Sequence, residues 1–412
     1  MTEHFDALET RSPEEREGTL MAALSAQVAY AKANAPFYAR FLADVDPATI
    51  NSRTALADLP ITRKSALLKT QQAAPPLGGL LAVPLSQVSH VYMSPGPIFE
   101  VDTTAAGHQG AARAMHAAGF RAGDIVYNTF SYHLTPAGMM MDASARVLGC
   151  VVVPGGVGNT ELQLDAIEAI RPSGYVGTPS FLKILLDRAV EQGRNVSSLH
   201  RALVGAEALP AVLREGFRAR GMSVLQCYGT ADLGIIAYES EALEGMIVDE
   251  GIILEIVRPG TGDPVGEGEV GEIVVTTFNR AYPLLRFATG DLSTILPGQS
   301  SCGRTNARIR GWMGRADQRT KVRGMFVDPA QVAAIKKHHP ELGRVRLVVD
   351  WIDQADVMIV KAETAQQSPE LARAVESTVQ ALCKVRGTVE FVAPGDLPND
   401  GKIIDDVRPI DT

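Results

Sequence analysis

The sequence predicts an α/β protein in which a large N-terminal domain with a β subdomain is followed by a small α+β domain. Its 412 residues exceed what one hydrophobic core usually supports. Between residues 88 and 280, short β-branched runs alternate with alanine-rich helical stretches, which is typical of βαβ units around a largely parallel sheet. After residue 250 the strands are separated by turn-rich segments, which indicates the β subdomain.

The first predicted element is an N-terminal helix within residues 14–42. Leu20, Leu24 and Val28 recur at helical spacing along this segment. Pro36 interrupts the pattern, because proline cannot continue a helix. We therefore expect a broken or kinked helix.

The middle of the chain illustrates the βαβ pattern. Residues 151–153 (VVV) predict a strand, and residues 161–170 predict a helix after a glycine-rich turn. Thr160 and Gln163 have the spacing of a capping box, in which two side chains bond to backbone N–H groups at the start of the helix. We expect the helix to begin at this pair.

The remaining elements form two β-rich parts. Strands are predicted at residues 252–257 and 272–276, on either side of a turn-rich segment, and the C-terminal part combines helices that begin at Pro329 and Pro369 with strands at residues 344–350, 357–362 and 388–392. This change of pattern divides the chain into domains at residues 1–316 and 317–412.

Composition and charge are those of an ordinary globular protein. Hydrophobic residues make up 46% of the chain and charged residues 21%, and the net charge is −8. The N-terminal residues show no secretory signal, no apolar run is long enough to cross a bilayer, and the four cysteines lie far apart. We expect a cytoplasmic protein without a disulfide framework or a zinc knuckle.

Residues 304–323 carry seven basic side chains against one acidic side chain, Asp317. In an acidic chain such a segment focuses positive potential locally and predicts contact with an anion. A solvated basic face or a DNA contact is the alternative, because basic runs are common.

Three segments together resemble the adenylate-forming enzymes. They are residues 228–232 (YGTAD), residues 286–291 (RFATGD) and residues 314–318 (GRADQ). The chain is most similar to the phenylacetate-coenzyme A ligases of this superfamily, over nearly its whole length. The resemblance implies an acyl-adenylate-forming N-terminal domain and a mobile C-terminal lid, with ATP, Mg²⁺ and coenzyme A as cofactors.

The resemblance assigns nucleotide contacts to the first of these segments. Tyr228 would stack on adenine, Gly229 and Thr230 would lie at the phosphates, and Asp232 would hold Mg²⁺ as a hard oxygen ligand. The chain has aspartate where glutamate is usual, and Ala231 is inserted next to the threonine of the motif. Two further groups resemble binding turns at strand ends: Gly205, Ala206 and Glu207 for adenine, and Tyr132, His133, Thr178 and Pro179 for the acid substrate.

The resemblance gives the C-terminal half the remaining roles. Asp291 would bind both ribose hydroxyls, since a carboxylate offers two acceptor oxygens, and Arg315 would contact ribose and phosphate. Asp317 would be the pivot of the lid, and Gly324 would line the path of the coenzyme A thiol. Lys402 would neutralise charge on the carboxylate and the α-phosphate during adenylation.

The largest departure from the family lies at residues 94–97 (SPGP). Relatives have a loop rich in serine, threonine and glycine here, which ends in Gly-Lys and wraps the ATP phosphates. Two prolines remove amide donors, the lysine is absent, and Glu100 adds negative charge. This loop is expected to be a poor phosphate cradle.

The function that the sequence predicts is ATP-dependent activation of a carboxylic acid through an acyl-adenylate, followed by transfer to coenzyme A. The acid is expected to be aromatic, because an aromatic and histidine wall suits an aryl carboxylate. The alternatives are an ATP-independent acyl transferase on the same fold and a non-catalytic sensor of nucleotide or coenzyme A. We expect the acid and coenzyme A as partners, with no nucleic acid and no membrane, and a homodimer is left open.

Overall fold

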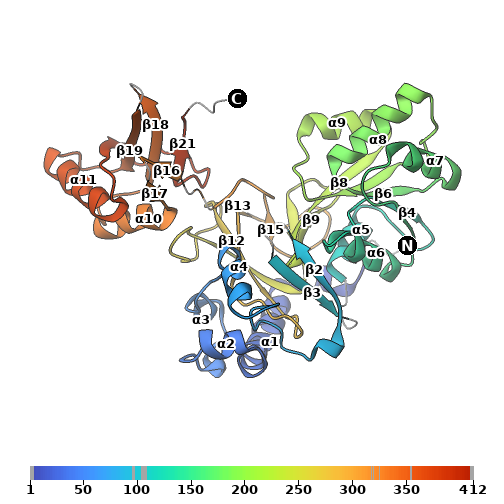
Figure 1. The fold of residues 1–412 in the computed structure, drawn as a ribbon, viewed down its shortest axis with the longest axis horizontal. Helices are drawn as coiled ribbons and strands as arrows, with labels where there is room; N and C mark the ends of the chain where they lie inside the picture. Colours follow the sequence, from blue (N-terminus) through green and yellow to red (C-terminus); the bar gives the residue numbers. More distant parts are fainter. Residues whose placement is uncertain are drawn as a thin grey trace. The chain divides into compact units, whose positions relative to one another are not determined.

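The computed structural model describes residues 4–94, 98–103, 109–316, 318, 320–323, 325–352 and 355–408 (Figure 1). The chain divides into two compact units. The first contains Met1–Leu254, Val275–Phe287 and Leu296–Gly311, and the second contains Glu255–Val274, Ala288–Ile295 and Trp312–Thr412. The predicted domain boundary at residue 317 stays a prediction.

A nine-stranded sheet, which lies mainly in the first unit, has the order β14-β15-β10-β9-β8-β7-β6-β4-β5. Its strands are β4 (Ile125–Asn128), β5 (Val151–Pro154), β6 (Gly174–Gly177), β7 (Arg201–Val204), β8 (Ser223–Thr230), β9 (Gly234–Glu239), β10 (Met246–Val248), β14 (Ile295–Leu296) and β15 (Arg308–Ile309). Strands β4 to β8 pair in parallel, whereas β9, β10 and β15 pair antiparallel. The predicted α/β class with a largely parallel sheet is confirmed.

Helices cover both faces of the parallel strands (Figure 1). They are α5 (Gln109–Ala117), α6 (Ala137–Val147), α7 (Thr160–Ile170), α8 (Pro179–Gln192) and α9 (Ala211–Ala219). Val126 and Val176 pack with α5 and α6, while Tyr127 and Tyr175 pack with α7, α8 and α9. Neighbouring residues of a strand point to opposite faces, so each strand contributes to two cores.

The start of α7 differs from the prediction. Asn159 is its cap residue, in a left-handed conformation with φ 48°, and its side chain makes no capping hydrogen bond. Gln163 Nε2 instead donates to the carbonyl oxygens of Gly156 (2.9 Å) and Gly158 (2.7 Å). The predicted capping box at Thr160 and Gln163 is wrong, because the glutamine side chain holds the preceding glycine turn.

The N-terminal helices confirm the predicted break at Pro36. Helix α1 (Pro13–Asn34) ends before it, and α2 (Pro36–Phe41) begins with it. Leu20, Leu24 and Val28 of α1 lie in a buried core that also contains Ile253. Three more elements follow: α3 (Arg53–Ala57), β1 (Thr62–Arg63) and α4 (Lys64–Ala73).

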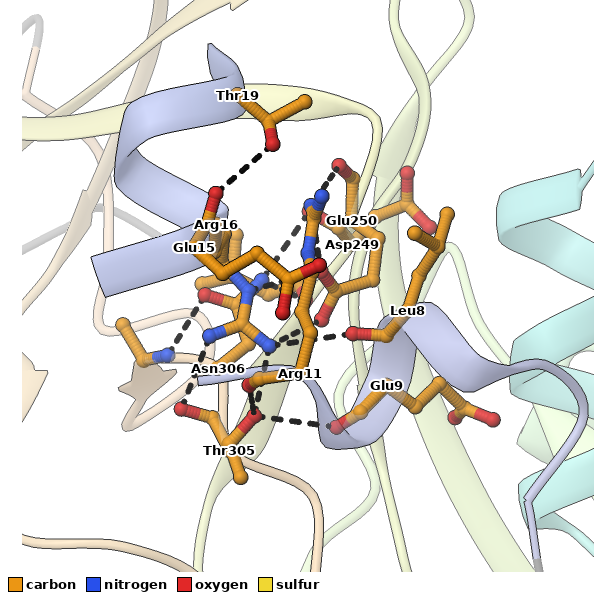
Figure 2. A network of polar contacts seen from close by, with 12 residues as sticks. Leu8, Glu9, Arg11, Glu15, Arg16, Thr19, Asp249, Glu250, Thr305 and Asn306 are labelled. Atoms are coloured by element: carbon orange, nitrogen blue, oxygen red, sulfur yellow. Dashed lines mark hydrogen bonds and ion pairs between the residues drawn. The ribbon is translucent and has the colours of Figure 1, made fainter. Parts of the chain in front are cut away.

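A network of buried charges fixes the segment before α1 to the first unit (Figure 2). Glu250, with only 1% of its side chain exposed, accepts hydrogen bonds from Arg11 (3.0 Å) and Arg16 (2.8 Å). Nearby, Glu9 accepts from Arg304 (2.5 Å) and from the Tyr238 hydroxyl (2.8 Å). Each buried carboxylate therefore has a cationic partner, which burial of a charge requires.

The later parts of the chain match the predicted pattern. Strands β11 (Ile252–Val257), β12 (Gly271–Thr277) and β13 (Phe287–Ser293) are neighbours in one sheet, and each contributes residues to both units. The C-terminal part contains β16 (Thr320–Val322), β17 (Met325–Val327), α10 (Pro329–His338), β18 (Val345–Ile352), β19 (Ala355–Glu363), α11 (Pro369–Cys383), β20 (Thr388–Val392) and β21 (Ile404–Asp406). Its four-stranded sheet has the order β20-β19-β18-β21. The sequence did not predict β16, β17 or β21.

Candidate active site

Four of the predicted segments follow neighbouring parallel strands of the large sheet. Tyr132 and His133 follow β4, Thr178 follows β6, Gly205 follows β7, and Tyr228 lies near the end of β8. Because these four strands are adjacent and parallel, their carboxyl ends meet at one edge of the sheet. Open α/β sheets bind their ligands at this edge, so the structure brings the predicted segments together.

The turn after β7 shows why glycine is needed there. A Cβ at Gly205 would lie 3.0 Å from Cys227 Sγ on β8, so the backbone of this turn approaches the next strand closely. Ala206 has a left-handed φ of 64°, and both Ala206 and Glu207 are exposed. Glu207 Oε1 accepts a hydrogen bond from Ser180 Oγ (2.9 Å), which links this turn to the start of α8.

The segment after β6 begins a helix at the same edge. Thr178 caps α8 by accepting a hydrogen bond from Phe181 N–H, and Pro179 takes the first helical position. The Tyr175 hydroxyl donates to the carbonyl oxygen of Thr178 (3.0 Å). Thr178 and Pro179 are therefore held rigidly where the predicted acid pocket would be.

Tyr132 is the more restrained of the two residues that follow β4. Its hydroxyl accepts a hydrogen bond from Asn128 Nδ2 (2.8 Å), and burial followed by the charge of Asp142 raises the pKa of Tyr132 to about 12. The phenol thus stays neutral at physiological pH. His133 is exposed, and its backbone N–H donates to Ser131 Oγ (3.1 Å).

The end of β8 is packed too tightly for any side chain at Gly229. A Cβ there would lie 2.3 Å from the Gly234 carbonyl oxygen. Tyr228 is buried, and Thr230 Oγ1 accepts a hydrogen bond from Leu233 N–H (3.3 Å). This bond closes the turn that carries Asp232.

Asp232 lies in a buried charge cluster that the sequence did not predict. Its Oδ2 accepts a hydrogen bond from the ammonium of Lys64, the first residue of α4. Glu100 on β3 (Ile98–Thr103) is only 2% exposed, and its carboxylate accepts from Ser94 Oγ at the end of β2 (Val88–Ser94). Asp232 also lines a hollow of about 350 Å³ together with Tyr282.

No local pattern could have revealed this cluster, because Lys64 and Asp232 are 168 positions apart. The sequence feature that could have indicated this cluster is Glu100 itself, because it is an acidic residue at a position of the strand that faces the interior. The charged residues near Glu100, namely Lys64 and Asp232, cannot be identified from the sequence, because only the fold brings α4, β3 and the turn after β8 together.

Asp232 fits the Mg²⁺ role that the resemblance implies. Its Oδ1 is buried and has no hydrogen-bond partner in the described part of the chain. Within the same residues, no group of three or more His, Cys, Asp or Glu side chains could hold a metal ion. Mg²⁺ commonly takes one or two carboxylates and completes its shell with water and substrate phosphates, so a single free carboxylate oxygen suffices.

Glu100 gives a testable pH dependence. Burial raises the pKa of its carboxyl to about 7 despite the hydrogen bond from Ser94, whereas an unfolded glutamate titrates near its usual value of about 4.3. Between these values the folded state binds one more proton than the unfolded state, so the free energy of unfolding falls as the pH rises. Glu100→Gln should remove about 2–3 kcal/mol of this fall between pH 5 and pH 8.

Urea unfolding of wild type and Glu100→Gln at both pH values measures this difference. Glu191→Gln, at a glutamate with 62% side-chain exposure, serves as the control and should leave the pH dependence unchanged. Parallel pH profiles for wild type and Glu100→Gln would show that Glu100 is already ionised at pH 5.

The second unit holds the predicted ribose residues together. Asp291 Oδ1 accepts hydrogen bonds from Arg315 Nη1 (3.0 Å) and Trp312 Nε1 (3.1 Å). Gly290 permits this approach, because a Cβ there would lie 2.5 Å from Arg315 Nη2. Asp291 and Arg315 are therefore neighbours in the second unit.

Lys402 and Arg315 line one hollow of about 430 Å³ in this unit. Lys402 Nζ contacts Asp405 Oδ1 (2.9 Å), and about half of the lysine side chain is exposed. Gln318 fixes the loop that carries Lys402: its Nε2 donates to the carbonyl oxygens of Arg315 (3.1 Å) and Gly401 (3.0 Å). The sequence analysis gave Gln318 no role of its own, although it belongs to the GRADQ segment.

Some predicted residues cannot be compared with the structure. Asp317, Gly324 and the loop residues 95–97 lie outside the described residues. Their predicted roles stay predictions.

The basic segment 304–323 is not a single anion site. Arg304 and Arg308 are buried in the first unit, where Arg304 pairs with Glu9 and Arg308 donates to the carbonyl oxygens of Glu244 (2.6 Å) and Pro297 (2.8 Å). Both guanidinium groups therefore bind acceptors inside the protein and are not available to an external anion. The expectation of one focused positive segment is wrong for these two arginines, because both are buried and bonded to partners outside the segment.

Comparison with known proteins finds one family model and several related ligases. The profile described as AMP-binding enzyme matches residues 103–280. The phenylacetate-coenzyme A ligase of Thermus thermophilus is 32% identical over 86% of this chain and 84% of that protein, and the enzyme of Aromatoleum evansii is 29% identical over 95% and 93%. A crystal structure of 2-hydroxyisobutyryl-CoA ligase with 2-HIB-AMP and coenzyme A has a TM-score of 0.73 at 25% identity, over 95% of this chain and 91% of that one.

These similarities extend well beyond the strand-end segments and cover most of the chain. Among the described residues, no helix combines the length and the apolar character needed to cross a bilayer. The extent of this similarity shows that the chain belongs to the phenylacetate-coenzyme A ligase family of the adenylate-forming enzymes.

Proposed function

We propose that this protein is an AMP-forming acid–thiol ligase, which activates a carboxylic acid with ATP and transfers the acyl group to coenzyme A. The observation that carries this proposal is the convergence of four predicted binding segments at the carboxyl edge of the sheet. The relatives named above support the same reaction. An aromatic acid and a cytoplasmic location are finer predictions from the sequence, which leaves a homodimer open.

The residues of the first unit would bind and orient the reactants. Tyr228 and the turn at Gly205 would hold adenine, while Tyr132 and Thr178 would contact the acid. Asp232 would hold Mg²⁺, which neutralises charge on the ATP phosphates when it is bound. Lys64 keeps Asp232 in place through their ion pair.

The residues of the second unit would bind ribose and assist adenylation. Asp291 would accept the ribose hydroxyls, and Arg315 would contact the phosphate. Lys402 would neutralise the negative charge that develops between the carboxylate and the α-phosphate. A lid rotation about Asp317 would then admit the thiol to the acyl carbonyl.

The buried carboxyl group of Glu100 favours one alternative, an acyl transferase on the same fold that uses no ATP. Its carboxyl lies on the hairpin β2–β3, whose loop replaces the phosphate loop of relatives. Because the pKa of this carboxyl is raised to about 7, its ionised form, which predominates above that pH, would repel nearby phosphates. This alternative therefore predicts acyl transfer without pyrophosphate release.

ATP–pyrophosphate exchange over a panel of aryl and small aliphatic acids tests the proposal. Acid-dependent exchange followed by coenzyme A-dependent AMP release supports the ligase. Thioester formation from a supplied acyl donor, without exchange for any acid, would instead support the transferase. Coenzyme A binding without turnover would indicate a sensor.

Asp291→Ala is expected to weaken AMP binding by about 1–3 kcal/mol, because a charged hydrogen-bond partner of ribose is lost. Titration calorimetry measures the change. Asp263→Ala, at an exposed aspartate of the same unit, should bind AMP like wild type. Equal affinity for Asp291→Ala and wild type, with both proteins folded, would remove Asp291 from the nucleotide site.

A further inference from the structure

A second pocket in the C-terminal unit has mostly positive charges among its charged lining residues. It encloses about 100 Å³ between the segments on either side of the β11–β12 turn, helix α10 and the loop that carries Lys402. The charged residues of its lining are Arg258, Lys336, Arg344, Arg346 and Lys402, with Glu269 as the single acid. None of the roles above uses this pocket as a whole.

Neighbouring carboxylates neutralise three of the five cations. Arg258 Nη2 contacts Glu269 Oε1 (3.2 Å), and Lys402 contacts Asp405. Arg346 pairs with Asp400 and lies 3.7 Å from Asp405. The remaining charges are therefore those of Lys336 and Arg344.

Lys336 and Arg344 have no carboxylate partner in the described part of the chain. Arg344 Nη1 donates only to the carbonyl oxygen of Leu397 (3.1 Å), which is neutral. No hydrogen bond or ion pair of the Lys336 ammonium is present among the same residues. Burial, and then the charge of Arg258, lower the pKa of Lys336, as expected for an ammonium that lacks a counter-charge.

Arg346, which lines the same pocket, has a buried N–H donor without a hydrogen-bond acceptor in the described residues. It is 7% exposed, and this donor is its Nε. Buried donors are nearly always satisfied in folded proteins. The pocket thus combines two uncompensated positive charges with a donor that has no acceptor.

We propose that this pocket binds a phosphate group. Phosphate carries close to two negative charges, which matches Lys336 and Arg344, and its several oxygens can accept from both and from Arg258. The enclosed space suits one tetrahedral anion rather than a whole nucleotide. The group could be free phosphate or the phosphomonoester of coenzyme A, which share this chemistry.

A bound phosphate would tie together two parts of the unit that are distant in sequence. Arg258 follows β11 directly, whereas Lys336 lies on α10. An anion between them would replace repulsion between their cations by attraction to a common partner. Phosphate is therefore expected to raise the melting temperature of the protein.

Titration calorimetry of the full-length protein with inorganic phosphate tests the site. Lys336→Gln is expected to weaken phosphate binding at least 10-fold, because one of two uncompensated charges is lost. The adjacent Lys337 is exposed and does not line the pocket, so Lys337→Gln should bind phosphate like wild type. If Lys336→Gln does not fold by circular dichroism, Arg344→Gln replaces it with the same expected loss, because Arg344 is an exposed residue that carries the other uncompensated charge.

Comparison of coenzyme A with 3′-dephospho-coenzyme A distinguishes the two sources. A loss of affinity on removing the 3′-phosphate that disappears in Lys336→Gln would identify coenzyme A as the carrier. Equal affinities, with phosphate binding that still depends on Lys336, would identify free phosphate. No phosphate binding at millimolar concentration, or equal binding by the Lys336 and Lys337 variants, would overturn the proposal, whether or not the protein is a ligase.

Discussion

Lys402→Ala is expected to slow acyl-adenylate formation by about 10²–10³-fold while leaving thioester formation from a supplied acyl-adenylate largely intact. The lysine shares a hollow with Arg315, and Gln318 fixes its loop. Its ammonium would stabilise charge only in the transition state of the first half-reaction, so the second half-reaction should not need it. Pyrophosphate release and thioester formation, measured separately, report the two steps.

Lys183→Ala is a matched control for this variant. Lys183 has a similar exposure, 56% of its side chain, and a comparable local ion pair with Asp187. The Lys183→Ala variant should carry out both half-reactions at the wild-type rate. If Lys402→Ala slows both half-reactions equally, with its fold intact, the lysine does not act specifically in adenylation.

Glu250→Ala is expected to lower the free energy of unfolding by about 3–5 kcal/mol. The substitution leaves Arg11 and Arg16 buried without the carboxylate that both share (Figure 2). A buried cation without a partner retains its full desolvation penalty, which exceeds the loss of any single exposed ion pair. Chemical denaturation monitored by circular dichroism measures the change.

Glu161→Ala provides the contrast for this stability prediction. Glu161 pairs with Arg188, but 55% of its side chain is exposed, so water can solvate the freed arginine. We expect little measurable change in its unfolding midpoint. Similar losses for Glu161→Ala and Glu250→Ala would mean that burial does not decide the strength of these pairs.

The sequence predicted the regular elements well where local patterns determine them. Pro36 marks the break between α1 and α2. This break is predictable from the sequence, because the proline ring fixes φ and removes the backbone N–H that a continuing helix needs. Pro369 likewise begins α11. The binding segments were identified by their resemblance to the adenylate-forming enzymes, and the structure places them at neighbouring strand ends.

The charge pairs were not predictable, because their partners are far apart in the sequence. Arg304 was read as part of an anion site, yet it pairs with Glu9, 295 positions earlier. Lys64 and Asp232 also form an ion pair between distant positions of the sequence. Local sequence shows that a residue is charged, but only the fold decides whether that charge meets water, a ligand or another side chain.

The buried contacts of the N-terminal segment have a consequence for synthesis on the ribosome. Glu9 and Arg16 are made first, but their partners Arg304 and Glu250 emerge only after 295 and 234 further positions. At about 5–20 residues per second, the delay is on the order of tens of seconds. During this time the apolar stripe of α1 at Leu20 and Leu24 lacks its final core and is available to chaperones, so this helix is expected to be among the last elements of its unit to dock.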